Sequence, residues 1–177
     1  DAINFESPGY EYCPGADDDA SGVAVTMEVA RILANVPLRK TVVFMPFNAE
    51  EVGLVGSRAA ARDFKNAGTL VEAMFNYDMV GYVGDSYWDL DMSSGSNTAY
   101  RTLNANSATR LTGLVPNIFG LGSSSDHYSF HEQGFNISDN IEGDFNSAGW
   151  HTNLDISTRM NFDYLTDVVR MAAASIA

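Results

Sequence analysis

The fold is decided by the apolar stretch Thr41-Val-Val-Phe-Met-Pro-Phe47, which runs into Asn48-Ala-Glu50-Glu51 and then into the turn Val52-Gly-Leu-Val-Gly56-Ser57. A long apolar run bounded by turn signals is typical of a buried strand in an α/β sheet. Functional groups in such sheets collect at the carboxyl ends of the strands, where Glu50 and Glu51 are expected. Neighbouring side chains there point in different directions, so one carboxylate can bind a metal while the other handles a proton. A solvated surface turn is the alternative for an isolated Glu-Glu pair.

Outward from this stretch, the chain alternates between apolar runs and helical patterns. We expect helices ending near Asn35 and over 56–67, 97–111 and 161–176, a short helix from 126, strands over 71–79, 87–92 and 135–141, and loops over 1–16 and 116–125. This alternation predicts a three-layer α/β/α sandwich with a mostly parallel central sheet.

Composition restricts the class of protein. The 177 residues fit one domain, 1–177, and carry a net charge of −13 without a Lys/Arg cluster, so a nucleic-acid partner is not expected. No apolar run approaches the roughly 20 residues that cross a bilayer, so no membrane partner is expected either. Cys13 is the single cysteine, which excludes an internal disulfide and a multi-cysteine zinc site.

Three successive aspartates, Asp17 to Asp19, precede the first helical pattern. Either Asp19 or Ser21 can cap that helix, and negative charge suits its N-terminus. Capping needs one aspartate, so the other two are candidates for cation binding.

Five candidate residues fall at loop or strand ends in four separate segments: Asp17, Glu50, Glu51, Asp78 and His151. Carboxylate oxygens with one imidazole suit zinc or a similar divalent ion. A carboxylate left outside the ligand set can take a proton from a metal-activated water.

Five blocks together resemble the co-catalytic di-zinc aminopeptidases, the family of bacterial leucyl aminopeptidase and glutamate carboxypeptidase. In order, they are Pro14-Gly-Ala-Asp-Asp-Asp-Ala-Ser-Gly22, Glu50-Glu-Val-Gly-Leu-Val-Gly-Ser57, Tyr77-Asp-Met79, Ser125-Asp-His127, and His151-Thr152 with Asp155. The resemblance covers nearly the whole chain from Pro14 and implies a zinc-exopeptidase fold.

For the metal site, the resemblance implies two zinc ions bridged by Asp17, with a cis peptide bond often following that residue. Glu51 and His151 would complete one zinc site with Asp17, and Asp78 would bind the other ion.

For catalysis, the resemblance implies that Glu50 is the general base on the bridging water and later gives the proton to the leaving amine. Met79 and Trp150 would line the side-chain pocket. His127 would lie at the active-site wall, contacting substrate or orienting a loop, with zinc binding by His127 and His131 as an alternative.

One departure from the family pattern concerns the N-terminus. The family has a His-x-Asp motif upstream of the bridging aspartate, whereas this chain has no histidine before His127, and Asp1 lies where the Asp of that motif is expected. We therefore expect an N-terminally truncated catalytic domain with a complete site for one zinc ion and an incomplete site for the second, so that it holds one zinc ion or none.

The resemblance favours a zinc exopeptidase that removes apolar N-terminal residues from peptides with a free N-terminus, and a secreted or periplasmic location. The alternatives are a carboxypeptidase, a glutaminyl-cyclase-like enzyme, or an inactive binding domain on a peptidase scaffold. A carboxypeptidase needs a basic residue for the substrate carboxylate. Arg58, Arg101 and Arg110 are available, but none lies in a recognisable carboxylate-binding motif.

Overall fold

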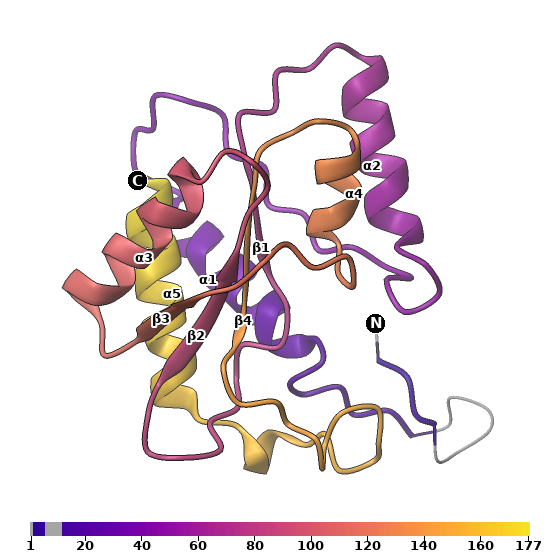
Figure 1. Cartoon of the computed structure of the whole chain (residues 1–177), viewed down its shortest axis with the longest axis vertical. Coiled ribbons are helices and arrows are strands. Elements are labelled where there is room, and N and C mark those ends of the chain that lie inside the picture. Colours follow the sequence, from indigo (N-terminus) through magenta and orange to yellow (C-terminus); the bar gives the residue numbers. More distant parts are fainter. Residues whose placement is uncertain (1, 6–11) are drawn as a thin grey trace.

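A mixed sheet between two layers of helices makes up the fold in the computed structural model, which describes residues 2–5 and 12–177 (Figure 1). In chain order the elements are α1 (Ala20–Leu33), α2 (Val55–Asn66), β1 (Met74–Tyr77), β2 (Asp89–Ser93), α3 (Ala99–Leu111), β3 (Val115–Ile118), α4 (His127–Glu132), β4 (Ile137–Glu142), the 3-10 turn η1 (Ser157–Arg159) and α5 (Phe162–Ile176). The expectation for Asp1 lies outside the described residues.

The sheet has the strand order β1-β4-β2-β3. β1 pairs with β4 and β2 pairs with β3 in parallel, while β2 and β4 are antiparallel. The predicted mostly parallel sheet is therefore confirmed. Asp78 directly follows the carboxyl end of β1. Because β2 and β4 are antiparallel, the amino-terminal half of β2 lies near Asp78, two strands away.

Helices cover both faces of the sheet, as the α/β/α prediction requires. α5 contacts both α1 and α3 on one face, whereas α2 and α4 pair on the other (Figure 1). The larger apolar core lies under the first layer and includes Val25, Leu90 and Val168, all fully buried. A smaller core around Phe130 and Ile137 lies under the second layer.

The start of α1 is held tightly against the end of β1. Asp19 caps the helix by accepting a hydrogen bond from the backbone N–H of Gly22 at 3.1 Å, an interaction that stabilises a helix by about 1 kcal/mol. A Cβ at Gly22 would lie 2.0 Å from the carbonyl oxygen of Tyr77, so only glycine allows this approach. The contact brings the three aspartates before α1 to the end of β1.

Two predictions about strands were wrong. Residues 41–47 form no strand; Val43 and Met45 are exposed, and Phe44 and Phe47 are half-buried. An apolar run needs a neighbouring strand to form a ladder, and the described sheet begins at β1. Conversely, Val115–Ile118 is strand β3 and not a loop. Its edge position tolerates Pro116, which has no N–H to donate.

The remaining predicted helices and strands are confirmed with boundaries shifted by a few residues, whereas the predicted loop over 1–16 lies partly outside the described residues. The predicted strand over 71–79 shortens to Met74–Tyr77, and the weakly alternating 87–92 becomes Asp89–Ser93. None of the helices in the described part of the chain is long and apolar enough to cross a membrane.

Candidate active site

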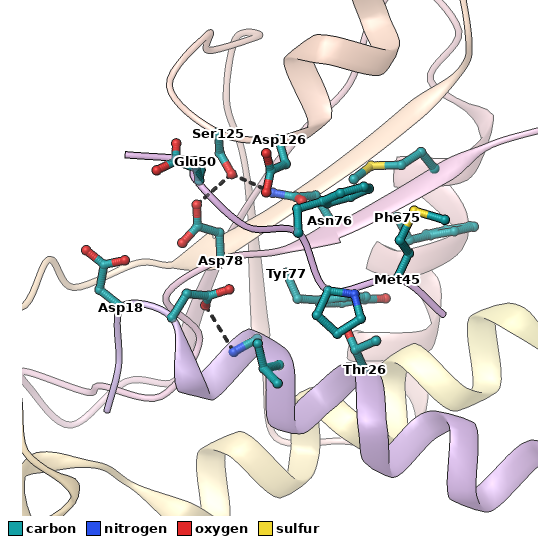
Figure 2. Close-up of a pocket in the computed structure, with 16 residues that line it drawn as sticks. Asp18, Thr26, Met45, Glu50, Phe75, Asn76, Tyr77, Asp78, Ser125 and Asp126 are labelled. Atoms are coloured by element: carbon teal, nitrogen blue, oxygen red, sulfur yellow. Dashed lines mark hydrogen bonds between the residues drawn. The ribbon is translucent and has the colours of Figure 1, made fainter. Parts of the chain in front are cut away.

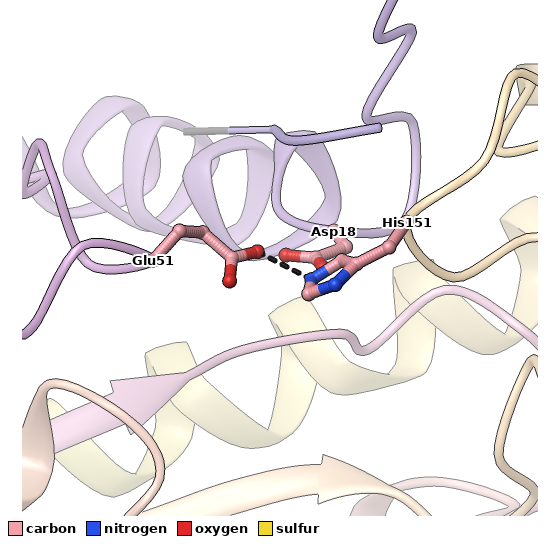
Figure 3. Close-up of side chains that lie close together, drawn as sticks. All are labelled: Asp18, Glu51 and His151. Atoms are coloured by element: carbon pink, nitrogen blue, oxygen red, sulfur yellow. Dashed lines mark hydrogen bonds and ion pairs between the residues drawn. The ribbon is translucent and has the colours of Figure 1, made fainter. Parts of the chain in front are cut away.

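Asp18, Glu51 and His151 meet at the ends of three separate loops (Figure 3). His151 Nε2 lies 2.6 Å from Glu51 Oε1 and 3.1 Å from Asp18 Oδ2. One ligand atom from each residue lies within 4.8 Å of the others, and the three side chains are largely buried. Two oxygens and one nitrogen at this spacing fit the donor set of a zinc ion.

Backbone strain surrounds this cluster. His151 itself has φ = 56°, and Ala49 and Met79, next to Glu50 and Asp78, have φ values of 62° and 52°. Residues other than glycine rarely adopt this left-handed conformation, and such outliers concentrate at functional sites.

The structure places Asp17 away from the predicted zinc cluster. Its Oδ1 accepts a hydrogen bond from the N–H of Gly81 at 3.1 Å, and its Oδ2 accepts one from Asn146 Nδ2 at 3.2 Å. It also faces the Glu142 carboxyl group, and burial raises the pKa of both acids, to about 10 for Glu142. Asp18 occupies the place predicted for Asp17, and the cis peptide bond joins Asp18 to Asp19, one residue later than expected.

Asp155 fixes the loop that carries Asp18. Its Oδ1 and Oδ2 accept the backbone N–H groups of Asp17 and Asp18 at 2.9 and 3.0 Å. Its own backbone carbonyl accepts the N–H of Ala16 at 3.1 Å. Because Asp155 is buried, these bonds are shielded from water and hold Asp18 in one orientation.

Glu50 and Asp78 line the same site together with Asp18 (Figure 2). Asp78 follows β1 and accepts a hydrogen bond from Ser125 Oγ at 2.5 Å. Burial and the neighbouring carboxylates, Asp78 foremost, raise the pKa of Glu50 to about 7. A carboxylate with a pKa near neutrality is suited to accept and return a proton.

Burial and mutual repulsion of the carboxyl groups make the cluster favourable for a cation. Burial, followed by the charges of Asp78 and Glu51, raises the pKa of Asp18 to about 9. Burial also raises the pKa of Asp78 to about 6, against the lowering effect of Ser125. Two cavities adjoin these side chains, and Asp18, Glu50 and Asp78 line both of them. No Lys or Arg occurs among the described residues that line either cavity. A divalent cation would relieve this repulsion and lower these pKa values.

A cavity of about 320 Å³ opens beside the cluster. Its acidic end is formed by Asp18, Glu50, Glu51 and Asp78 together with His151. Its apolar wall comes from Met79, Phe119, Ile141, Phe145 and Trp150. The Trp150 and His151 rings stack with centroids 3.8 Å apart, which joins the apolar wall to the metal cluster.

Comparison with known proteins agrees with this geometry. The family model described as "Peptidase family M28" matches residues 1–176. This chain belongs to peptidase family M28. The resemblance to the zinc peptidases is thereby confirmed at the level of the family.

Named relatives of this M28 chain are peptidases. It is 34% identical to aminopeptidase YwaD of Bacillus subtilis over 139 residues, 75% of this chain and 30% of that protein. It is 53% identical to a probable zinc metalloprotease of Pyrenophora tritici-repentis over 68 residues, 38% of this chain and 16% of the relative.

A solved structure shares the fold of this M28 chain. The aminopeptidase from Aneurinibacillus sp. strain AM-1 superposes with a TM-score of 0.83 and 34% identity, over 94% of this chain and 40% of that one. The M28 chain thus spans less than half the length of the relatives described here.

His127 lies at the wall of the site in this M28 chain, but both ring nitrogens are engaged. Nδ1 lies 3.1 Å from Asp139 Oδ1, and Nε2 lies 3.1 Å from the carbonyl oxygen of Gly122. Burial lowers the pKa of His127, but the Asp139 carboxylate, the Gly122 carbonyl and the Asp78 charge together raise it overall. These contacts favour loop positioning by His127 over direct substrate contact.

Two residues of the site were not predicted in their present roles: Asp155 as the support of Asp18, and Asp139 beside His127. Asp18 was one of the aspartates open to cation binding, but the resemblance assigned the ligand role to Asp17. A run of three aspartates gives no signal for which one faces a metal, because loops have no fixed side-chain period. Asp155 belongs to a motif block, but its hydrogen bonds to residues more than 130 positions away depend on tertiary structure.

Proposed function

We propose that this chain supplies the catalytic centre of a zinc-dependent aminopeptidase. The observation that carries the proposal is the convergence of Asp18, Glu51 and His151 beside the carboxylate of Glu50, in an acidic pocket without a basic residue among its described lining. Asp18 takes the ligand role that the resemblance assigned to Asp17.

Zinc fits the donor set of the cluster, and Asp18, Glu51 and His151 would hold it. When bound, the ion polarises the scissile carbonyl and lowers the pKa of a water at the site. Glu50 would take the proton from that water and pass it to the leaving amine, as its raised pKa allows.

Asp78 and Asp18 would hold a second ion. Among the described residues, Asp18, Glu51 and His151 are the single group of three suitable donors, so we expect one tightly held zinc ion. The acidic end of the cavity would also attract the α-ammonium group of a peptide. Secretion of the protein stays a prediction.

An acidic cavity favours an aminopeptidase over a carboxypeptidase. A substrate carboxylate needs an Arg or Lys partner, and neither cavity has one among its described lining residues. A free α-amine is instead attracted by Asp78 and Glu50.

The test is hydrolysis of amino-acid p-nitroanilides by the zinc-loaded chain, with N-acetylated anilides as the blocked substrates. Glu50→Gln is expected to lower kcat by about 10²–10⁴-fold while the zinc content stays the same. The matched control, Glu132→Gln, changes an exposed glutamate on α4 and should retain full activity. Cleavage of acetylated substrates at the same rate would overturn the aminopeptidase assignment. Zinc binding without any hydrolysis would instead support a binding domain on a peptidase scaffold.

A further inference from the structure

We propose that Asp91 is a specificity-determining residue that selects substrates with a long basic N-terminal side chain, lysine or arginine. The proposal rests on the proposed aminopeptidase function and names its substrate class. It departs from the expectation of apolar N-terminal residues, which the apolar wall of the cavity taken alone would support.

Asp91 lies on the floor of the 320 Å³ cavity, in a row of residues that crosses the sheet. Ile141 of β4 pairs with Asp91 of β2, which pairs with Asn117 of β3. Asp78 begins the row, because its N–H donates to the carbonyl of Asn140 and continues the β1–β4 register by one residue. Since neighbouring strands lie about 4.8 Å apart, the Cα atoms of Asp78 and Asp91 are about 10 Å apart.

Hydrogen bonds show that Asp91 points to the cavity face of the sheet. Asn117 Nδ2 donates to Asp91 Oδ1 at 3.2 Å. Two residues along β2, Ser93 donates to Asp139 at 3.3 Å, and Asp139 lines the same cavity. The intervening side chains point the other way, as the strand period requires, and Leu90 is part of the larger apolar core.

The Asp91 carboxylate has no cationic partner among the described residues. Asn117 supplies one amide hydrogen bond, and none of the salt bridges in the described part of the chain involves Asp91. Asp139 is different, because Asn76, Ser93 and His127 all contact its oxygens. Asp91 is therefore the carboxylate of the cavity floor that remains available to a ligand.

The distance and the lining both match a basic side chain. An extended lysine places its ammonium about 6 Å from its Cα. A substrate with its α-amine near Asp78 can therefore extend across Ile141 and bring the ammonium within hydrogen-bond reach of Asp91. The methylene stem would pack on apolar residues such as Phe119 and Ile141, as lysine and arginine stems commonly do.

Other N-terminal side chains of a substrate fit the cavity floor at Asp91 less well than lysine or arginine. A glutamate would face Asp91 with like charge. A leucine or norleucine would cover the carboxylate without giving it a partner, which carries a desolvation cost. Lysine and norleucine differ only in the terminal ammonium, so this pair isolates the contribution of Asp91.

The experiment compares lysine and norleucine p-nitroanilides on the zinc-loaded chain. We expect kcat/KM to be at least about tenfold higher for lysine, the ratio that corresponds to 1.4 kcal/mol. Asp91→Asn should remove that preference, so that the kcat/KM values for lysine and norleucine lie within about twofold of each other. The control Asp63→Asn, at an exposed position on α2, should leave both values unchanged. Equal kcat/KM for the two substrates, or a lysine preference that survives in Asp91→Asn, would overturn the proposal.

Failure of the proposed function can be separated from failure of this inference. If no anilide is hydrolysed, the aminopeptidase assignment fails, and binding of lysine amide and norleucine amide is measured by calorimetry on the same protein. Tighter binding of lysine amide that is lost in Asp91→Asn supports the assignment of Asp91. Equal binding of the two amides, or binding of neither, overturns it.

Discussion

Asp155 accepts the backbone N–H of Asp18 at 3.0 Å, although 137 positions separate the two residues in the sequence. The bond holds the backbone of a candidate metal ligand, while the Asp18 side chain remains directed at Glu51 and His151. Because the other oxygen of Asp155 holds the N–H of Asp17, rotation of this loop would break two buried hydrogen bonds together.

We therefore predict that Asp155→Asn weakens zinc binding. The amide replaces one acceptor oxygen by a donor, which then faces a backbone N–H. Loss of a residue that hydrogen-bonds to a metal ligand typically lowers metal affinity by about 10–100-fold. Competition with a chromophoric chelator measures the affinity. The control Asp163→Asn alters an exposed aspartate on α5 and should bind zinc like the unaltered chain. An unchanged affinity in Asp155→Asn would contradict a positioning role.

The contrast between Asp17 and Asp18 gives the second prediction. Asp18→Asn should lower zinc affinity by more than about 100-fold, because it removes a ligand itself and not a residue that supports a ligand. Asp17→Asn should retain most of the affinity, because the Asp17 side chain contacts Gly81, Asn146 and Glu142 instead of the cluster. The same chelator competition measures both variants. Equal losses in the two would return Asp17 to the ligand set.

Much of the fold was predictable from the sequence because local patterns determine it. Asp19, one of the two residues expected as the cap, caps α1, and the apolar stripe near the C-terminus gives α5. The segment 41–47 shows the limit of such reasoning. Its continuous apolar run predicts a buried strand, but strand formation depends on a partner strand, which no local pattern reveals.

The site was predictable at the level of segments and not of single side chains. Glu51 and His151 lie in one cluster, as the family resemblance implied, because each belongs to a recognisable motif block. The choice between Asp17 and Asp18 depends on how the loop is held by Asp155, a contact between distant parts of the chain. Asp91 gave no signal, because a single acid in a weakly alternating strand is also typical of a solvated face.

Zinc binding is expected to release protons, which is the third prediction. In the metal-free chain, burial and neighbouring acids hold the pKa of Asp18 at about 9 and that of Glu50 at about 7. A ligand carboxylate must be ionised, so zinc must displace the Asp18 proton at pH 7. Calorimetry in two buffers with different ionisation enthalpies should give a release of about one proton per zinc. Affinity should also increase as the pH rises from 6 to 8. Zinc binding without proton release would show that Asp18 is already ionised in the metal-free chain.

The fourth prediction concerns Glu142, whose side chain is buried against Asp17. Burial, followed by the Asp17 charge, raises the pKa of Glu142 from 4.5 to about 10. The folded chain therefore binds more protons than the unfolded chain between these values, and stability falls as pH rises through that window. One proton contributes at most about 1.4 kcal/mol per pH unit to the free energy of unfolding.

Glu142→Gln replaces the acid by a neutral amide of similar shape, so it should flatten this dependence. Urea unfolding with EDTA at pH 5, 7 and 9 measures the free energy of unfolding without a contribution from bound metal. The unaltered chain should lose stability from pH 5 to 9, while Glu142→Gln should lose less and be the more stable protein at pH 9. The acids of the metal cluster titrate in both proteins, so their contribution to the pH dependence of stability cancels when the two proteins are compared. The exposed control Glu132→Gln should follow the unaltered chain. Parallel pH profiles for Glu142→Gln and the unaltered chain would contradict the raised pKa of Glu142 in the folded protein.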